Sequence, residues 1–372
     1  MKVALVHDWL TGMRGGEKCL EVLCEIFPGA DLYTLIYDPA AVSPTISRCN
    51  IKVSWIGCLP AAQNYFRYLL PLFPHAVEKF ELGDYDLIVS SSHCVAKGIF
   101  PHRALHIAYL HAPMRYVWDQ HDAYFGAGAS WSSRAAMALC RSYLQRWDLR
   151  SAERVDYFVA NSENVASKIR ALYRREAAVI HPPVDVERFQ STECQEPYYL
   201  IVSALVPYKK IDIAIAAFNK LKLPLKIAGE GPLRQKLRNL ARPNIEFLGW
   251  VSDAKLAALY ASCQALIFPG EEDFGIVPLE AQASGRPVIG YGKGGLLETV
   301  LPSDDSGLAT GVLYRESTAE SLTAAVRAYQ QSRDRFDPAA IRRHACRFSR
   351  DRFKVQIRDY LTARAREHRA KT

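Results

Sequence analysis

Short apolar runs alternate with amphipathic stretches along the whole chain. The runs that predict strands lie near residues 3–6, 31–36, 87–91, 106–111, 157–161 and 178–181 in the first half, and near residues 199–203, 225–229, 245–248, 265–269, 287–290 and 309–313 in the second. Helical periodicity fills the stretches between them, for example over residues 211–221, 233–240 and 254–261. Strands that alternate with helices are typical of α/β proteins with parallel sheets.

This alternation divides the chain into two halves of similar size. A proline-bearing, polar stretch over residues 181–197 separates them and predicts a domain boundary. We therefore assign residues 1–185 to an N-terminal Rossmann-like domain and residues 186–347 to a C-terminal one. Residues 348–372 form a basic segment that we expect to be helical. The length of 372 residues also favours two domains.

Composition narrows the class of protein. Hydrophobic residues make up 49% and charged residues 23%, which is ordinary for a globular chain, and no apolar run is long enough to span a bilayer. The N-terminus reads as a first strand rather than a signal peptide. Nine cysteines show no C-x-x-C pair. Four of them lie in apolar segments, and we expect them to be reduced core thiols of a cytoplasmic protein: Cys19, Cys24, Cys94 and Cys263.

The formal net charge of +8 fits an anionic substrate, an anionic membrane surface or nucleic acid, although solubility alone could account for it. Neither a zinc-finger spacing nor an RNP-like motif is present, so nucleic acid is disfavoured as a partner. Residues 54–73 and 130–154 combine basic and aromatic side chains. Such stretches fit a membrane surface and a lipid-linked acceptor. A helix with its apolar stripe in the core and its arginines in solvent fits equally well.

Glu272 and Glu280 are the most informative residues, and seven residues separate them. A predicted buried strand precedes the pair, and a predicted helix over residues 278–284 follows Glu272, so residues 275–277 lie at a helix N-terminus. Backbone amides there favour an anion, and glycine at 275 lets the backbone approach it. This layout suits a sugar nucleotide, with diphosphate on the amides, one carboxylate on the sugar and the other on the ribose.

The run over residues 271–289 resembles the Glu-x7-Glu signature of retaining glycosyltransferases of family 4, which have the GT-B fold of two Rossmann-like domains facing across a cleft. The resemblance covers nearly the whole chain and is strongest over residues 200–300. It implies transfer of a hexosyl group from a nucleotide sugar, with no cofactor and no metal. It also implies that the last helix returns to the N-terminal domain.

A narrower resemblance is to bacterial polysaccharide and O-antigen mannosyltransferases, through the segment from His111 to Arg115. It implies GDP-mannose as donor, a lipid-linked surface glycan as acceptor and work at the inner face of the cytoplasmic membrane. His111 would face the donor sugar, and Arg115 would contact phosphate. Lys209 matches the family lysine that neutralises the diphosphate. Many members carry Arg where this chain has Ala204, so either Lys210 or an N-terminal-domain Arg substitutes for it, or the clamp is weaker.

By this resemblance the catalytic residues are Glu272, His111 and Lys209. The donor-binding residues are Gly15, Gly16, Lys209, Lys210, Gly229, Trp250, Val251, Asp273, Phe274, Gly275, Ile276, Val277 and Glu280. They follow predicted strands, where ligands of open α/β sheets bind. A core position for Trp250 fits equally well. We interpret the D-x-D sequence at residues 84–86 as strand-start capping rather than a metal site.

Three other functions stay open. The chain could bind a nucleotide sugar without catalysis, as a pathway partner, since Ala204 leaves the cationic clamp incomplete. It could be a family 4 transferase that uses a UDP-, ADP- or dTDP-sugar. It could also be a GT-B enzyme of another reaction type, such as a phosphorylase or an epimerase.

Overall fold

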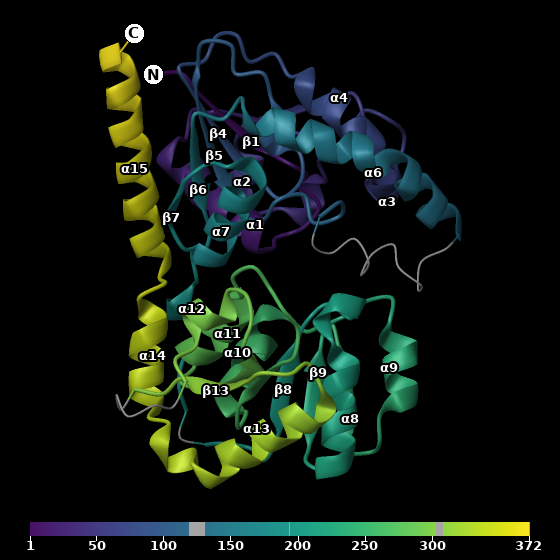
Figure 1. The fold of residues 1–372 in the computed structure, drawn as a ribbon. Coiled ribbons are helices and arrows are strands. Elements are labelled where there is room, and N and C mark those ends of the chain that lie inside the picture. The colour runs from purple at the N-terminus through teal and green to yellow at the C-terminus, as the bar shows by residue number, and fades with distance from the viewer. Residues whose placement is uncertain (119–130, 193, 303–307, 372) are drawn as a thin grey trace. The chain divides into compact units, whose positions relative to one another are not determined.

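A computed structural model describes residues 1–118, 131–192, 194–302 and 308–371. The chain divides into two compact units (Figure 1). The first comprises Met1–Pro183 together with Asp351–Thr372, and the second comprises Val184–Arg350. Each unit is built on one parallel sheet, so the predicted α/β class of two Rossmann-like halves is confirmed.

The sheet of the first unit has the strand order β3-β2-β1-β4-β5-β6-β7. Its strands are β1 (Val3–His7), β2 (Asp31–Thr34), β3 (Asn50–Val53), β4 (Leu87–Ser92), β5 (Leu105–Leu110), β6 (Tyr157–Ala160) and β7 (Ala177–Val179). Its helices are α1 (Gly15–Ile26), α2 (Pro44–Ser47), α3 (Ala62–Tyr65), α4 (Phe73–Glu78), α6 (Trp131–Ala152), α7 (Glu163–Tyr173) and α15 (Arg350–Lys371), with 3-10 turns η1 (Pro39–Ala41), η2 (Phe66–Leu72) and η3 (Ala96–Gly98).

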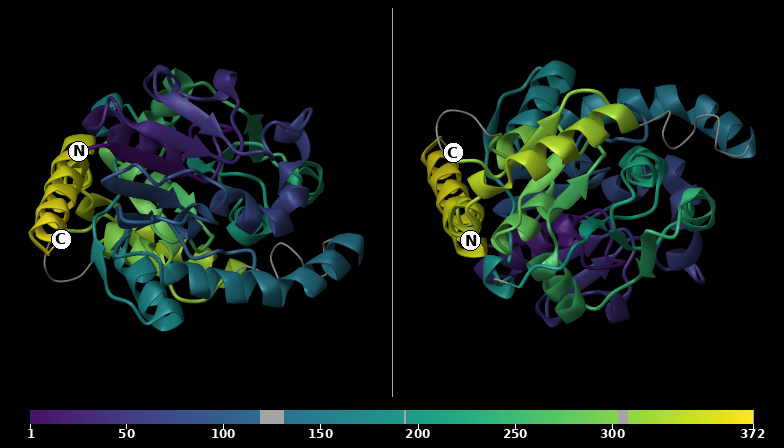
Figure 2. Two further views of the ribbon diagram at one scale, coloured as in Figure 1. Left: turned by 90° about the horizontal axis from the view of Figure 1, so that it is seen from above. Right: turned by 90° about the horizontal axis from the view of Figure 1, so that it is seen from below.

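Alternate residues of the central strands point to opposite faces of this sheet. Ala4 and Val6 of β1 pack in a core cluster with α4 and α6, whereas Leu5 packs in another with α1 and α15. Figure 2 shows α6 and α15 on different sides of this unit. All five residues of β1 are buried, as expected for a strand covered by helices on both faces.

The sheet of the second unit has the order β10-β9-β8-β11-β12-β13. Its strands are β8 (Tyr199–Val202), β9 (Leu225–Ala228), β10 (Ile245–Gly249), β11 (Leu266–Phe268), β12 (Val288–Tyr291) and β13 (Gly311–Tyr314). Its helices are α8 (Ile211–Leu221), α9 (Arg234–Leu240), α10 (Asp253–Ser262), α11 (Ile276–Ala283), α12 (Leu296–Thr299), α13 (Ala319–Gln331) and α14 (Pro338–Cys346), with 3-10 turns η4 (Val186–Arg188), η5 (Pro207–Lys209) and η6 (Arg333–Arg335).

The structure differs from the sequence expectations in a few places. Strand β3 was not predicted, because its four residues are only half-buried or exposed and carry little apolar signal. Strand β2 ends at Thr34 instead of continuing to residue 36, and β13 begins at Gly311 rather than residue 309. Within the expected linker, Val186 and Phe189 are buried in the core of the second unit. The four predicted core thiols are all buried, as expected.

Candidate functional site

The loops after β8, β9, β10 and β11 lie along one edge of the second sheet, because these strands are parallel neighbours. They carry most of the residues that the sequence singled out. Lys209 ends the turn after β8, Gly229 follows β9, Trp250 follows β10 and Glu272 follows β11. The geometry of these loops can therefore be described within this one unit.

Lys209 and Glu272 form an ion pair through Nζ and Oε1. The two side chains are only 14% and 22% exposed, so water screens the pair weakly. Gly270 permits this arrangement, since a Cβ there would stand 2.9 Å from the Cα of Lys209. Sequence placed these two residues in separate loops, and the fold brings their charges into contact.

The backbone around Glu272 is held by the loop after β12. Its carbonyl oxygen accepts a hydrogen bond from the Gly295 amide at 2.9 Å. Gly294 passes so close that a Cβ would lie 2.3 Å from this oxygen. Gly275 then takes a left-handed conformation, with φ of 92°, and caps α11. The amides of Ile276 and Val277 thus begin the helix, where an anion is favoured.

Glu280 lies inside α11 and is only 7% exposed. Its Oε2 accepts a hydrogen bond of 3.0 Å from the hydroxyl of Tyr260, which fixes the direction of the carboxylate. Burial, and then the charge of Glu280, raise the pKa of Tyr260. Asp273 and Phe274 are buried, and the Phe274 ring lies 6.0 Å from the ring of Phe348 in the core.

Trp250 is 77% exposed, so the interpretation of this residue as a core aromatic is wrong. The neighbouring Gly249 has φ of 69°, which turns the chain out of β10 and leaves the indole in solvent. Near this turn Arg234 donates a hydrogen bond of 2.8 Å to Glu230. No motif in the sequence pointed to Arg234. A Cβ on Gly249 would come within 3.5 Å of its guanidinium. It brings a cation to the edge where Ala204 lacks one.

In the first unit, three histidines stand at the carboxyl ends of adjacent strands. His7 ends β1, His93 follows β4 and His111 follows β5. The Ser91 hydroxyl links two of them, at 2.8 Å from Nε2 of His111 and 3.2 Å from Nδ1 of His7. Burial lowers the pKa of His111 to about 3, with help from the charges of His93 and His7. His111 is therefore a neutral hydrogen-bonding group at pH 7.

Asp8 holds the backbone next to this cluster of His7, His93 and His111. Its carboxylate accepts hydrogen bonds from four consecutive backbone amides, of His93, Cys94, Val95 and Ala96, at 2.6 to 3.0 Å. The Nδ1 atom of His93 also lies 3.0 Å from it. Burial alone would raise the pKa of Asp8, but the interactions with His93 and His7 together outweigh burial and lower it. The position of His93 is thus fixed through both its backbone and its ring.

Gly16 brings the start of α1 against the same cluster. A Cβ on Gly16 would stand 3.4 Å from Cε1 of His7 and 3.5 Å from Nε2 of His111. Neither Gly15 nor Gly16 has a positive φ, so the backbone conformation does not demand glycine at either position. Glu17 follows, with Oε1 3.8 Å from Nε2 of His7. Burial would raise the pKa of Glu17, but the interactions with His7 lower it.

Comparison with known proteins identifies the family. Residues 33–188 match the family model described as Glycosyltransferase Family 4, and residues 184–343 match the one described as Glycosyl transferases group 1. The chain belongs to the glycosyltransferases of the family 4 type.

Individual relatives match this glycosyltransferase over part of their length. An uncharacterized glycosyltransferase of Methanocaldococcus jannaschii is 31% identical over 159 residues, which are 41% of this chain and 45% of the relative. The O-antigen chain mannosyltransferase C of Escherichia coli is 30% identical over 154 residues, 36% of this chain and 41% of the relative. The chain therefore spans less than half the length of these curated relatives.

A solved structure aligns with nearly all of this chain. The HepE protein of Anabaena, determined in complex with UDP, aligns with a TM-score of 0.70 at 18% identity, over 98% of this chain and 100% of HepE. At this identity the likeness shows the fold, and the fold is GT-B. Within the described ranges, no helix of the glycosyltransferase is long and apolar enough to cross a membrane.

The predicted site residues of this glycosyltransferase thus form two groups, one in each unit. Lys209, Glu272 and the start of α11 lie together in the second. Gly16 and His111 lie together in the first, and Arg115 is half-buried in the loop after β5. Sequence reasoning passed over His7, Asp8, His93 and Glu17. Their signal was positional, since His7 and Asp8 directly follow the first predicted strand, and His93 comes just after the third.

Proposed function

We propose that this glycosyltransferase moves a hexosyl group from a nucleotide sugar to a glycan acceptor with retention of configuration. The observation that carries the proposal is the partly buried Lys209–Glu272 pair at the carboxyl edge of the second sheet. The amides that begin α11 come only a few residues after Glu272. A cation, a carboxylate and the first amides of a helix at one edge are the groups that a sugar diphosphate needs.

The roles of the residues follow from their chemistry. Lys209 and the amides of Gly275 to Val277 would hold the diphosphate. Glu272 and His111 would fix the sugar hydroxyls, and Glu280 would accept from the ribose. In the resting protein Lys209 pairs with Glu272. When donor binds, the ammonium turns to the diphosphate and the carboxylate becomes available to the sugar.

The reaction would be a front-side displacement. The bond between the anomeric carbon and the diphosphate oxygen breaks, and the acceptor oxygen bonds to the same face of that carbon. The acceptor hydroxyl proton passes to the leaving diphosphate. The protein then contributes positioning and electrostatic stabilisation of the charge that develops on this leaving group.

We favour a mannosyl group from GDP-mannose and a lipid-linked bacterial surface glycan as acceptor. The support is the segment from His111 to Arg115 and the similarity to an O-antigen mannosyltransferase. A UDP-sugar is the second candidate, because the similar HepE structure contains UDP. We also infer a cytoplasmic location with peripheral contact to the inner face of the membrane. Exposed apolar side chains of the first unit, such as Trp55 and Tyr68, favour that contact.

Two substitutions test the catalytic assignment. Lys209→Met and Glu272→Gln should each abolish release of nucleoside diphosphate in the presence of glycolipid acceptors, with melting temperatures close to that of the wild type. Lys236→Met and Glu246→Gln are matched controls, because both residues are exposed in the same unit. Full turnover by Lys209→Met would refute the diphosphate role.

Nucleotide binding tests the donor and the non-catalytic alternative. A thermal shift selective for GDP over UDP, ADP and dTDP supports the mannosyl donor, since a ligand at 100 times its Kd adds about 2.7 kcal/mol of stability. A shift selective for a nucleotide with another base would make its sugar nucleotide the proposed donor and leave the proposed mechanism unchanged. Nucleotide binding without turnover on any glycolipid acceptor would support a binding partner in place of an enzyme.

A further inference from the structure

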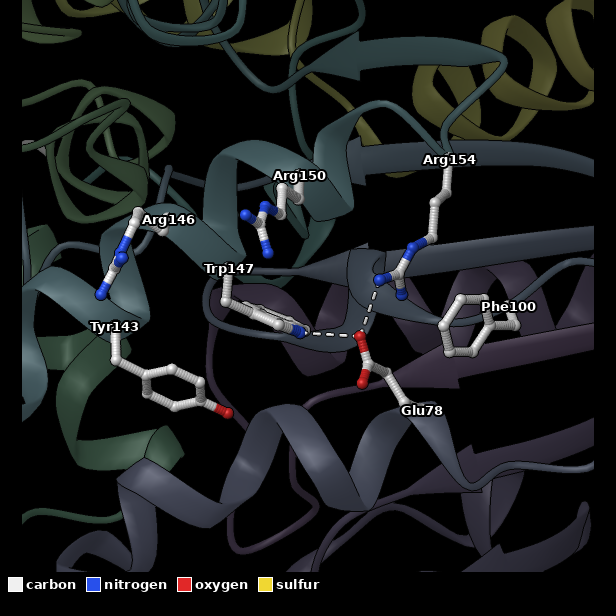
Figure 3. A pocket seen from close by; sticks show the side chains of 7 residues that line it. All are labelled: Glu78, Phe100, Tyr143, Arg146, Trp147, Arg150 and Arg154. Carbon is white, nitrogen blue, oxygen red and sulfur yellow. Dashed lines mark hydrogen bonds and ion pairs between the residues drawn. The ribbon is translucent and has the colours of Figure 1, made fainter.

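A pocket of about 490 Å³ opens on the first unit, where α6 faces α4 and the segment after η3 (Figure 3). Helix α6 contributes most of its lining, and Glu78 faces these side chains from the end of α4. The pocket carries three arginines and one glutamate, a net charge of +2. It lies outside the two groups of residues assigned to sugar transfer.

The floor of the pocket is held by hydrogen bonds, and its two charges neutralise each other. Oε1 of Glu78 accepts hydrogen bonds of 2.8 Å from the Trp147 indole and from the Arg154 guanidinium. Arg154 also donates to the carbonyl of Gly98 at 2.9 Å and stacks 3.9 Å from the centre of the Phe100 ring. A Cβ on Gly98 would stand 2.3 Å from the Trp147 ring, so only glycine lets the indole lie there.

Two cations remain at the mouth of the pocket. Arg146 and Arg150 lie one turn apart on α6, and both are exposed. Among the described residues, no acidic side chain pairs with either of them, and the one hydrogen bond of Arg146 goes from Nε to its own helix at Ser142. Like charges at this spacing destabilise a helix by a few tenths of a kcal/mol. An anionic ligand between the two guanidinium groups would offset this repulsion, because it attracts both of them.

Apolar side chains extend the same stripe of α6. Leu139 and Tyr143 precede Arg146 and Arg150 at helical spacing, and they are 83% and 43% exposed. Phe100, which supports the pocket, is 43% exposed. A free phosphate would use the guanidinium groups and leave these apolar groups in water. A phospholipid surface engages both, with phosphate on the arginines and apolar side chains among the acyl chains.

We propose that this pocket is a docking site for the phosphate headgroups of anionic phospholipids, and that α6 lies against the membrane surface through Leu139 and Tyr143. The proposal rests on the membrane contact put forward above and adds the site that makes it. It is independent of which sugar nucleotide is the donor.

Vesicle binding by the full chain tests the site. Sedimentation with phosphatidylglycerol-containing vesicles should give strong, salt-sensitive binding, and phosphatidylcholine vesicles weak binding. Each arginine near an anionic surface contributes about fivefold in partitioning, so Arg146→Gln/Arg150→Gln should bind about thirtyfold more weakly. Arg48→Gln/Arg238→Gln is the control, because it removes two exposed arginines elsewhere and leaves the same net charge. Leu139→Ser/Tyr143→Ser should also weaken binding, with little change in its salt dependence.

Three outcomes would overturn the proposal: no preference of the wild type for anionic vesicles, equal losses in the pocket and control pairs, or unchanged binding by the pocket pair. Loss of retention on an acidic polysaccharide by the pocket pair, with vesicle binding intact, would make a soluble polyanion the occupant instead. The thermal shift by nucleotide should be the same in the pocket pair as in the wild type. Failure of docking is thereby distinguished from failure of the transferase assignment.

Discussion

Two buried histidines should make the first unit sensitive to mild acid. Burial lowers the pKa of His106 to about 4 and that of His111 to about 3. Each ring is hydrogen-bonded to a serine hydroxyl at 2.8 Å, His106 to Ser90 and His111 to Ser91. An unfolded histidine titrates near 6.5, so between pH 6.5 and about 4 the unfolded chain binds protons that the folded chain does not.

The sign and size of the effect follow from this difference. Both contributions to stability are fully present above pH 6.5 and fall as the pH decreases towards the folded pKa values. At pH 5 each histidine is 1.5 units below its unfolded pKa, which corresponds to about 2 kcal/mol. The first unit should therefore lose about 4 kcal/mol of unfolding free energy between pH 8 and pH 5.

Urea unfolding followed by tryptophan fluorescence measures this loss. Five of the six tryptophans belong to the first unit, so the signal reports mainly on it. His106→Gln and His111→Gln keep a group that can bond the serine and remove the titration. Each should lose only about 2 kcal/mol over the same range, and the double variant close to none. His75→Gln, at an exposed position, is the control. Wild-type pH dependence in the double variant would refute the reasoning.

Three further predictions concern single positions. Gly16→Ala should stabilise the protein by about 0.5–1 kcal/mol, because the φ of Gly16 is not positive. The same substitution should lower turnover at least tenfold, because the added methyl group fills the space beside His111. An unchanged kcat/KM would mean that no ligand approaches Gly16. Lys97→Met should cost about 3–5 kcal/mol in urea unfolding, since it leaves the fully buried Asp148 carboxylate without its cation, and a loss under 1 kcal/mol would contradict that account. Trp250→Ala should weaken nucleotide binding in a titration without lowering Tm, because the indole is 77% exposed, and unchanged Kd would remove it from the donor site.

Much of the candidate site could be predicted because strand-ending loops carry a local signature. Gly275 shows this, since a glycine between a buried strand and a helix start can be recognised from the neighbouring residues alone. Contacts between residues far apart in the sequence could not be predicted. Lys209 meets Glu272 across 63 positions, and His7 reaches Ser91 across 84. Such contacts depend on strand order and register, which local periodicity does not contain.

The burial of individual side chains also could not be predicted from the sequence. The composition of residues 130–154 fitted either a membrane surface or a core helix, and the structure shows that α6 has both buried and exposed side chains. Trp147 is 8% exposed and packs on Gly98, while Leu139 on the same helix is 83% exposed. Trp250 likewise could have been core or surface, and only the turn at Gly249 decides it.

The sequence by itself determined the alternation of strands and helices, the two-unit α/β class and the loops that carry chemistry, because these depend on residue spacing within one element and its neighbours. The tertiary structure alone decided which charges touch, which imidazole is held neutral, and which arginines of α6 are exposed. Those properties arise from desolvation and from the neighbours that folding supplies, and both are set by parts of the chain far away in sequence.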